Sequence, residues 1–486
     1  MRTIDVSSNA ALAAVSILLV SGVSTAQTDR RLVEAVRQRD AAAARSLVNR
    51  RADVNVAEPD GATALHWAAH WDDLDTADLL IRAGALIDAA NDHGVTPIAL
   101  ASLNGSVAMV TRLLEAGASP NAARSTGETP LMTAARTGVV AVVQALVSRG
   151  ADVDARESTG QQTSLMWAVA EKHPLVVRAL IDAGADIRAR SKGGFTPLLF
   201  AARAGDIESA AALLAAGADV NETAPDGMSA LVVATVRGHA ALATLLLERG
   251  ADPNRGEAGF TALHWASGSW ETELTGPNGI VTQGDDEWSA LPGVGAGKLQ
   301  LVRALLAHGA DANAPLVKVP PRAGYTQLPV EHRVAGVNPY PGATPFLLAA
   351  MAGDVAVMRA LAEGGADPRR TALDGTTPLM VAAGLGRYMA ESHVTEQQSL
   401  EAVRLALDLG VDINAANDAG STALHGAAFI KANVLVRFLV DNGAAVNVAN
   451  KRGQTPLMVA DTIRAGSATV SGRTSTGDLL RELGAR

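Results

Sequence analysis

The sequence predicts an all-α solenoid, in which short helix pairs stack in a row instead of folding around one central core. A unit that begins Thr-Pro-Leu or Thr-Ala-Leu and closes with Gly-Ala-Asp recurs about every 33 residues. A glycine near the end of each unit keeps the same register from Gly84 to Gly443, so two independent marks share one period. Ala, Gly, Leu and Val are abundant and aromatic residues make up only 3% of the chain, which favours helices over sheet. We therefore expect about 11–12 helix-turn-helix repeats with interrupting loop insertions.

The unit that starts at Thr129 shows why the motif makes two antiparallel helices. The Thr129 hydroxyl can cap free N–H groups at a helix start, and Pro130 fits the first helical position. The paired alanines that follow keep this first helix thin. The second helix has apolar residues at helical spacing and ends at a glycine, where left-handed backbone costs least: Val142, Val143, Leu146, Val147 and Gly150. One such pair cannot bury its apolar faces alone, so neighbouring pairs must stack.

These residues resemble one family closely, the ankyrin repeats. The nearest matches are Thr-Ala-Leu-His-Trp-Ala-Ala from Thr63, Thr-Ala-Leu-His-Trp-Ala from Thr261 and Thr-Ala-Leu-His-Gly-Ala-Ala from Thr422. The resemblance covers nearly everything after residue 28. It implies an ankyrin-repeat solenoid that binds a protein and is not an enzyme.

The units divide the chain into caps, repeats and insertions. Leu32, Val33 and Val36 begin a degenerate first unit without the Thr-x-Leu motif, which indicates a capping repeat. The predicted segments are a capping repeat at 27–56, repeats at 57–268, an insertion inside a repeat at 269–297, the completion of that repeat at 298–314, an insertion between repeats at 315–341, repeats at 342–454 with an insertion at 387–398, and a capping repeat at 455–486.

The first 26 residues differ from the rest. Arg2 precedes an apolar stretch at 10–20, and the small residues Ser24, Thr25 and Ala26 are typical of a signal-peptidase site. We predict a signal peptide at 1–26, cleaved near Ala26, and a protein exported to a bacterial periplasm. The alternative is an anchor helix, but about 11 strongly apolar residues are too few for a bilayer, which needs roughly 20. No membrane anchor is expected.

The composition of the chain excludes several kinds of site and partner. The chain has no cysteine, which excludes disulfides, thiolate catalysis and cysteine-ligated metals. The net charge is −9 and no clustered basic face is evident, so we expect no nucleic acid partner. The glycine-rich stretch at 293–298 fails as a phosphate-binding loop, because Pro292 and Leu299 replace required residues. We predict no cofactor.

In the family that this sequence resembles, ligands contact the turn tips and the two positions after the paired alanines. On this chain those helix positions predict a partner-binding surface at His70, Trp71, Leu103, Asn104, Arg136, Arg203, Arg237, Phe429 and Ile430. The arginines predict a cationic track that suits carboxylates on a partner. The C-terminal positions, with Met351 and Leu385, are apolar and also suit self-association. The alternative is an ordinary variable surface.

Two other sets of side chains have simpler interpretations. The aromatic residues Trp67, Trp167, Phe200 and Trp265 occupy a framework position, so we expect them in the core between repeats. The histidines of the Thr-x-Leu-His motif, His66, His264 and His425, are expected to bond turn backbone and not a metal.

The insertions are the least generic part of the sequence. They carry four aromatic residues that we predict to recognise the partner: Trp270, Trp288, Tyr325 and Tyr340. The acidic run at 285–287 and His332 leave an alternative open, a small-ligand receptor or enzyme with a site built from 269–297 and 315–341. A loop without any partner is the simplest alternative, because loops tolerate insertion.

Overall fold

The computed structural model describes residues 29–268, 297–318, 341–386, 394–462 and 475–486. These residues form 24 helices in 12 consecutive pairs and, apart from two isolated bridges, no strand. The all-α fold class is confirmed. The chain divides into two compact units, unit 1 (Met1–Asp152) and unit 2 (Val153–Arg486).

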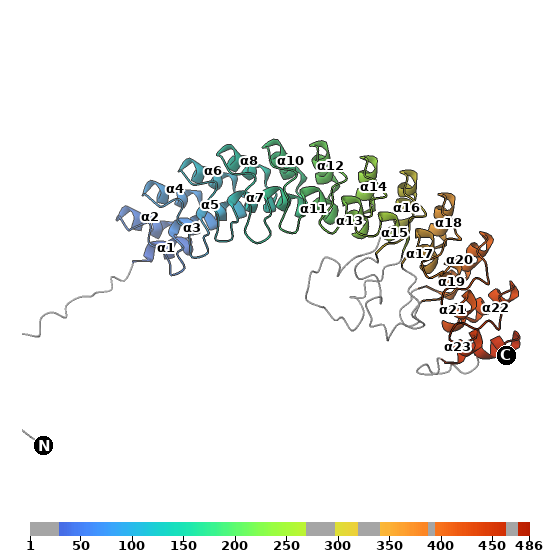
Figure 1. Cartoon of the computed structure of the whole chain (residues 1–486). Coiled ribbons are helices and arrows are strands. Elements are labelled where there is room, and N and C mark those ends of the chain that lie inside the picture. The colour runs from blue at the N-terminus through green and yellow to red at the C-terminus, as the bar shows by residue number, and fades with distance from the viewer. Residues whose placement is uncertain (1–28, 269–296, 319–340, 387–393, 463–474) are drawn as a thin grey trace, which may run out of the picture. The chain divides into compact units, whose positions relative to one another are not determined.

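Unit 1 contains four helix pairs, and the helices of each pair are separated by two or three residues. Its helices are α1 (Arg31–Arg37), α2 (Ala41–Asn49), α3 (Ala64–His70), α4 (Leu74–Arg82), α5 (Pro97–Leu103), α6 (Val107–Glu115), α7 (Pro130–Thr137) and α8 (Val140–Ser148). The first helices α1, α3, α5 and α7 pack in one row, and the second helices form another row beside it (Figure 1).

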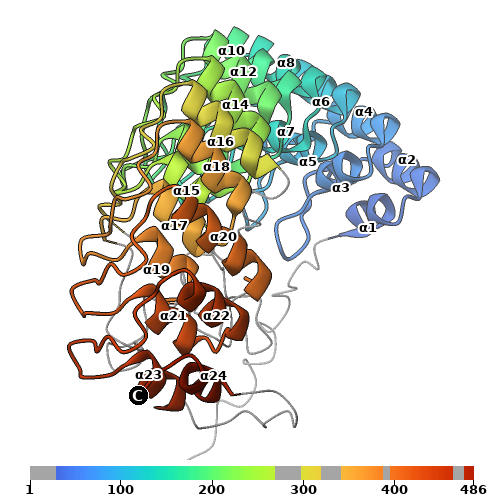
Figure 2. The same cartoon turned by 90° about the vertical axis from the view of Figure 1, so that its right-hand side faces the viewer.

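Unit 2 contains eight pairs, of which α15/α16, α19/α20 and α23/α24 have a longer connection between their two helices. Its helices are α9 (Ser164–Ala170), α10 (Pro174–Asp182), α11 (Pro197–Ala204), α12 (Ile207–Ala215), α13 (Ala230–Val236), α14 (Ala240–Glu248), α15 (Ala262–Ser267), α16 (Lys298–Ala307), α17 (Pro345–Met351), α18 (Val355–Glu363), α19 (Pro378–Ala382), α20 (Glu396–Asp408), α21 (Ala423–Phe429), α22 (Asn433–Asp441), α23 (Pro456–Thr462) and α24 (Thr476–Glu482). The turns that join successive pairs lie along one edge of these helices (Figure 2).

Local sequence explains where the helices begin and end. Thr129 accepts a hydrogen bond from the Met132 N–H at 3.3 Å, and Pro130 is the first residue of α7, as the motif predicts. Second helices are capped by a short polar side chain where one is present, such as Asp73 before α4. Gly150, after α8, has a φ of 84°, which only glycine adopts at low cost.

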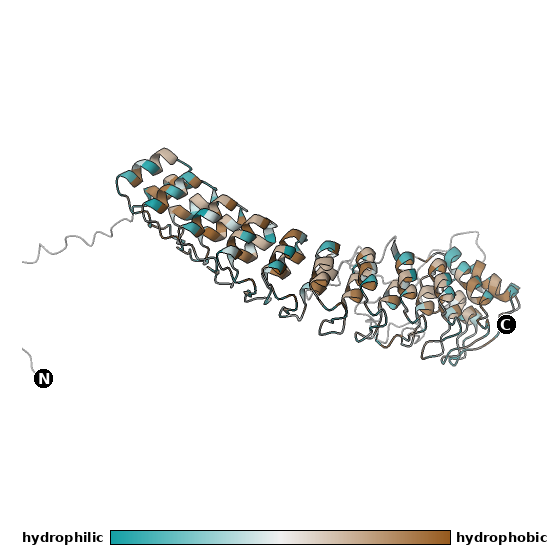
Figure 3. Ribbon diagram, turned by 90° about the horizontal axis from the view of Figure 1, so that it is seen from above, coloured by the Kyte–Doolittle hydropathy of each residue, from teal (hydrophilic) through white to brown (hydrophobic). Residues whose placement is uncertain are grey.

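The core of each unit lies between the two helix rows. Leu65, Leu80, Leu131 and Leu146 in unit 1 are completely buried, as are Leu165 and Leu198 in unit 2. The hydropathy colouring shows the same division, with hydrophobic residues concentrated on the helices and hydrophilic ones on the turns (Figure 3). Neighbouring repeats therefore share one continuous apolar layer within a unit.

An asparagine in the turn joins most repeats to the next. The Asn55 amide donates to the Gly84 carbonyl at 3.2 Å and accepts from the Leu86 N–H at 2.7 Å. The same bidentate contact recurs at Asn121, Asn221, Asn254, Asn313, Asn414 and Asn447. Asp88 and Asp154 hold this position elsewhere and accept a single N–H. Arg188 and Arg369 also hold it and, having no acceptor atom, cannot complete the contact.

The structure moves the edges of two predicted insertions. Leu316, inside the predicted insertion 315–341, is fixed against the next repeat, because its N–H donates to the Ala343 carbonyl and its carbonyl accepts the Gly342 N–H. The end of the insertion at 387–398 belongs to α20, because Thr395 and Gln398 form a capping box at its start. A further long connection, 463–474, separates α23 from α24, and the repeat pattern did not single it out.

Candidate protein-binding surface

The ends of the first helices in unit 1 bring the predicted residues His70 and Trp71 together with Arg39. Trp71 is 38% exposed, and its ring stacks on Trp67 with the ring centroids 6.2 Å apart. His70 meets the same ring edge-on at 4.5 Å, and the Arg39 guanidinium lies 5.6 Å from its centroid. The indole Nε1–H donates to the Arg37 carbonyl at 3.2 Å. Trp71 is thus a partly exposed aromatic side chain whose orientation is already fixed.

The same helix position in the next repeat is Asn104, and it has a similar structural role. Its amide donates to the carbonyls of Ala69 and His70 at 3.0 and 2.8 Å. Trp71 and Asn104 therefore each satisfy free carbonyls at the end of the preceding first helix. Beside Asn104, Leu103 is 48% exposed. The structure thus places His70, Trp71 and Leu103 on one surface, at the adjacent ends of α3 and α5.

The predicted cationic track consists of arginines that already have partners. Arg136 in unit 1 pairs with Glu128 at 3.5 Å, and Glu128 also pairs with Arg124 at 2.8 Å. Arg203 and Arg237 in unit 2 also take part in polar or electrostatic interactions. All three arginines therefore already interact with other groups of this chain.

The apolar C-terminal positions are less accessible than we predicted. Phe429, Ile430 and Met351 are half-buried, and Leu385 is buried, so its place on the binding surface was wrong. Ile430 packs against Gly384, where a β-carbon would lie 2.6 Å from the Ile430 Cδ1. The cause is the close approach of α19 and α21, which the glycines at 384 and 426 permit.

The aromatic framework residues divide into two groups. Phe200 and Trp265 are buried, as predicted, whereas Trp67 and Trp167 are only half-buried. The Trp67 indole donates to Glu58 at 2.7 Å, and Glu58 pairs with Arg37 at 3.3 Å. The core interpretation is therefore correct for two of the four positions.

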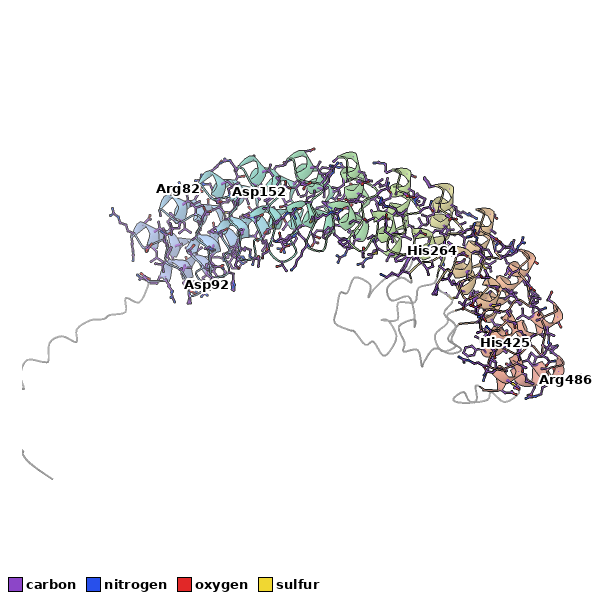
Figure 4. The ribbon with its side chains drawn as sticks, in the orientation of Figure 1. Arg82, Asp92, Asp152, His264, His425 and Arg486 are labelled. Atoms are coloured by element: carbon purple, nitrogen blue, oxygen red, sulfur yellow. The ribbon has the colours of Figure 1, made fainter. Side chains whose placement is uncertain are left out.

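The motif histidines are structural. In His66, Nδ1 accepts the Thr63 N–H at 3.1 Å, so Nε2 carries the proton and donates to Val95 of the next turn at 2.9 Å. His264 and His425 make the same pair of contacts, and both side chains lie among the first helices of unit 2 (Figure 4). Burial lowers the pKa of His66 and His425, and lowers that of His264 to about 4. No three His, Asp or Glu side chains of the described residues are grouped to hold a metal.

A family model described as ankyrin repeats (3 copies) matches residues 32–124, 117–191, 161–224, 198–274 and 392–464. These ranges cover well over half of the chain. The chain belongs to the ankyrin repeat family. Ankyrin repeats indicate a protein–protein interaction module.

Other comparisons add little to this assignment. The crystal structure of the human ASB11 ankyrin repeat domain is 27% identical and covers 46% of this chain and 98% of its own, with a TM-score of 0.41. No curated protein matches this chain.

Several of the predictions made from the sequence of this ankyrin repeat chain concern residues outside the described ranges. They concern the signal peptide at 1–26, the aromatic residues Trp270, Trp288, Tyr325 and Tyr340, the acidic run at 285–287 and His332. None of the helices that the structure describes has the length and apolar character to cross a bilayer.

Proposed function

We propose that this ankyrin repeat chain is a non-enzymatic scaffold that holds a protein partner against the ends of its first helices. The observation that carries the proposal is the rigid, partly exposed Trp71 beside the exposed Leu103. Interfaces draw most of their binding energy from a few aromatic side chains of this kind. Because neighbouring groups already fix the Trp71 ring, a partner loses little further conformational entropy on binding it.

The proposal also covers location and the insertions. The sequence of residues 1–26 supports export to a bacterial periplasm. The insertions at 269–297 and 315–341 contribute Trp270, Trp288, Tyr325 and Tyr340 to recognition, because aromatic residues on long connections are typical of binding loops. Self-association through the C-terminal repeats is a weaker proposal, since its apolar side chains are half-buried or buried.

The first experiment is affinity capture from the native periplasm, with the full chain and two matched variants as baits. Leu103→Ala removes an exposed leucine at the proposed surface, and Leu86→Ala removes a leucine that is 61% exposed in a turn of the same unit. We expect the dissociation constant of the captured partner to rise about tenfold or more for Leu103→Ala and to change less than about twofold for Leu86→Ala. Equal loss in both variants would exclude this helix-end surface.

A third bait that lacks 269–297 and 315–341 separates the two parts of the proposal. Loss of the partner from this bait alone would place recognition in the insertions and not on unit 1. If no bait holds any protein, the binding module is wrong, and a small-ligand receptor or enzyme built from the insertions becomes the better interpretation.

A further inference from the structure

Two consecutive turns at the start of unit 2 are tied into one surface. One turn, 156–162, lies between α8 and α9, and the other, 188–195, lies between α10 and α11. The Arg156 Nη1 donates to the Arg190 carbonyl at 2.6 Å, and the Lys192 N–H donates to the Gly160 carbonyl at 2.7 Å. Side chains on the two tips therefore keep a fixed relation to each other.

This surface, which we call the paired tips, carries four exposed cations: Arg156, Arg188, Arg190 and Lys192. Within the described parts of the chain, none of them has a carboxylate partner within 4 Å. Other turn arginines do, since Arg124 pairs with Glu128 at 2.8 Å and Arg255 pairs with Glu257 at 3.2 Å. Arg369 and Lys451, in other turns of unit 2, also have no ion pair among the described residues, so the distinguishing feature of the paired tips is that four such cations lie on two turns joined by hydrogen bonds.

The acidic groups near the paired tips bond elsewhere. Asp154 accepts the Asp186 N–H at 2.8 Å, and Asp186 accepts the Arg188 N–H at 2.9 Å. The Glu157 carboxylate accepts the N–H groups of its own tip, from residues 159, 160 and 162. Arg190 and Arg188 both act on the Glu222 carboxylate through space, but neither forms an ion pair with it, and this carboxylate accepts the Thr196 hydroxyl. The positive charge of the tips therefore remains uncompensated by an ion pair.

Two of the four cations are held in fixed orientations. The Arg190 Nη1 donates to the carbonyls of Gly194 and Thr223 at 2.7 and 3.1 Å. The Arg156 Nη1 similarly contacts the carbonyls of Gln161 and Arg190. Within the described structure, Nε and Nη2 of both guanidinium groups make no hydrogen bond. Such an ordered fork is the group that recognises a carboxylate through two parallel bonds.

Arg188 supplies an independent argument. It occupies the turn position where seven repeats have an asparagine that bonds both a carbonyl and an N–H of the next repeat. An arginine cannot accept the N–H, so a cation here forgoes a structural contact. Departures of this kind from the local rule are expected at functional sites. Arg369 makes the same departure, so the argument for Arg188 is its place beside three further cations on two joined turns.

We propose that the paired tips bind an acidic segment of the protein partner, a proposal that rests on the function proposed above. The cations come from two adjacent repeats, which are spaced about 10 Å apart. Three residues of extended chain span about the same length, so carboxylates at every second or third position can reach successive tips. A single compact anion would instead require donors that converge on one point. The paired tips also correct the expectation that no clustered basic face exists, because the cluster forms only when loops of separate repeats meet.

The test compares two double variants that remove two cations from the same repeat positions. Arg188→Asn/Lys192→Gln changes the paired tips. Arg369→Asn/Lys451→Gln changes equivalent positions in other turns of unit 2 and alters the net charge equally. Asparagine at 188 or 369 restores the residue found at most repeats, so neither variant is expected to lose its fold, and circular dichroism checks this.

The probe is a labelled deca-glutamate peptide, titrated with the full chain at low salt and followed by fluorescence anisotropy. We expect the dissociation constant to rise about tenfold in Arg188→Asn/Lys192→Gln and less than about twofold in the control. Equal weakening in both variants would overturn the proposal, because it would show non-specific attraction. Displacement of the peptide by an oligothymidylate or by inorganic phosphate at lower concentrations would overturn it in favour of another anion.

The captured partner distinguishes this proposal from the binding module itself. If the partner binds Arg188→Asn/Lys192→Gln as tightly as the unchanged chain, the paired tips are not its site, but the module stands. If no protein partner is captured, the proposed binding function is wrong, even if the deca-glutamate peptide binds.

Discussion

The regular repeats of unit 1 and the interrupted repeat α15/α16 of unit 2 connect their two helices in different ways. Between α5 and α6, Gly105 adopts a left-handed φ of 68° and Ser106 caps the next helix. After α15, Gly268 is extended, and the Lys298 ammonium at the start of α16 donates to its carbonyl at 3.0 Å. Lys298 also pairs with Asp354 of the next repeat at 3.1 Å.

The comparison teaches how the stack tolerates an insertion. A first helix needs its last carbonyls satisfied, and it does not matter whether the donor comes from a tight turn or from a side chain. In unit 1, Trp71 and Asn104 already act as such side-chain donors. In unit 2, the Lys298 ammonium donates to the carbonyl of Gly268, which directly follows α15, and α15 still packs against α13 and α17.

The largest effect is expected when one aromatic residue is replaced in each of the two regions. Trp265 in the interrupted repeat is 2% exposed, whereas Trp67 at the same repeat position of unit 1 is half-buried. We expect Trp265→Ala to lower the free energy of unfolding of its unit by about 3–5 kcal/mol, because it leaves a cavity. Trp67→Ala should cost about half as much. Urea unfolding followed by circular dichroism measures the free energy of unfolding of both variants. Equal losses would show that α15/α16 is packed no better around Trp265 than α3/α4 is around Trp67.

The second test uses pH. Burial lowers the folded-state pKa of His264 to about 4, below the 6.5 of an exposed histidine. The unfolded chain therefore binds the proton more readily, and stability falls as pH decreases from about 6.5 towards 4. We expect unit 2 to lose about 2 kcal/mol between pH 7 and pH 5 from this residue.

A matched pair of variants isolates that contribution. His264→Gln should reduce the pH dependence, and His308→Gln, at an exposed position directly after α16, is the matched control. If both variants kept the full pH dependence, His264 would not be its source.

The third test concerns Lys298 directly. Lys298→Met removes the hydrogen bond to Gly268 and the ion pair with Asp354, both partly exposed. We expect a loss of about 1 kcal/mol, most of it from the carbonyl left without a donor. The exposed Lys451→Met serves as control and should change thermal unfolding little. A loss in the control as large as in Lys298→Met would contradict the capping role.

The smallest expected effect is an increase in the stability of unit 2. Arg188→Asn and Arg369→Asn should each restore the bidentate contact of the turn position and stabilise unit 2 by about 0.5–1 kcal/mol. Asn121→Ala in unit 1 should cost a similar amount, because it removes that contact. Thermal unfolding of the three variants checks the sign, and a destabilising Arg188→Asn would show that arginine has a structural role there.

Much of the fold could be predicted because its rules act within one repeat. Thr129 caps α7, Pro130 begins it, and the glycines end the second helices, all through contacts within a few residues. The structure differs from the prediction at Thr395. This residue is the N-cap of α20, and it starts that helix inside the expected insertion.

The candidate site was harder to predict, because its residues act across repeats. The positions of Trp71 and Asn104 could be assigned from the motif, but their bonds to Arg37 and Ala69 could not. Leu385 was placed on the surface, although the glycines at 384 and 426 bring the next repeat over it. The paired tips were missed, although Arg188 at an asparagine position was a signal already present in the sequence.

The sequence by itself determined the period, the helix pairs and the family, since caps, turns and apolar spacing are local and repeat with each unit. Only the tertiary structure decided which side chains remain free for a partner. A side chain at the end of one repeat finds its hydrogen-bond or ion-pair partner in the next repeat, some 29–36 residues away, and only the stacked chain brings the two together.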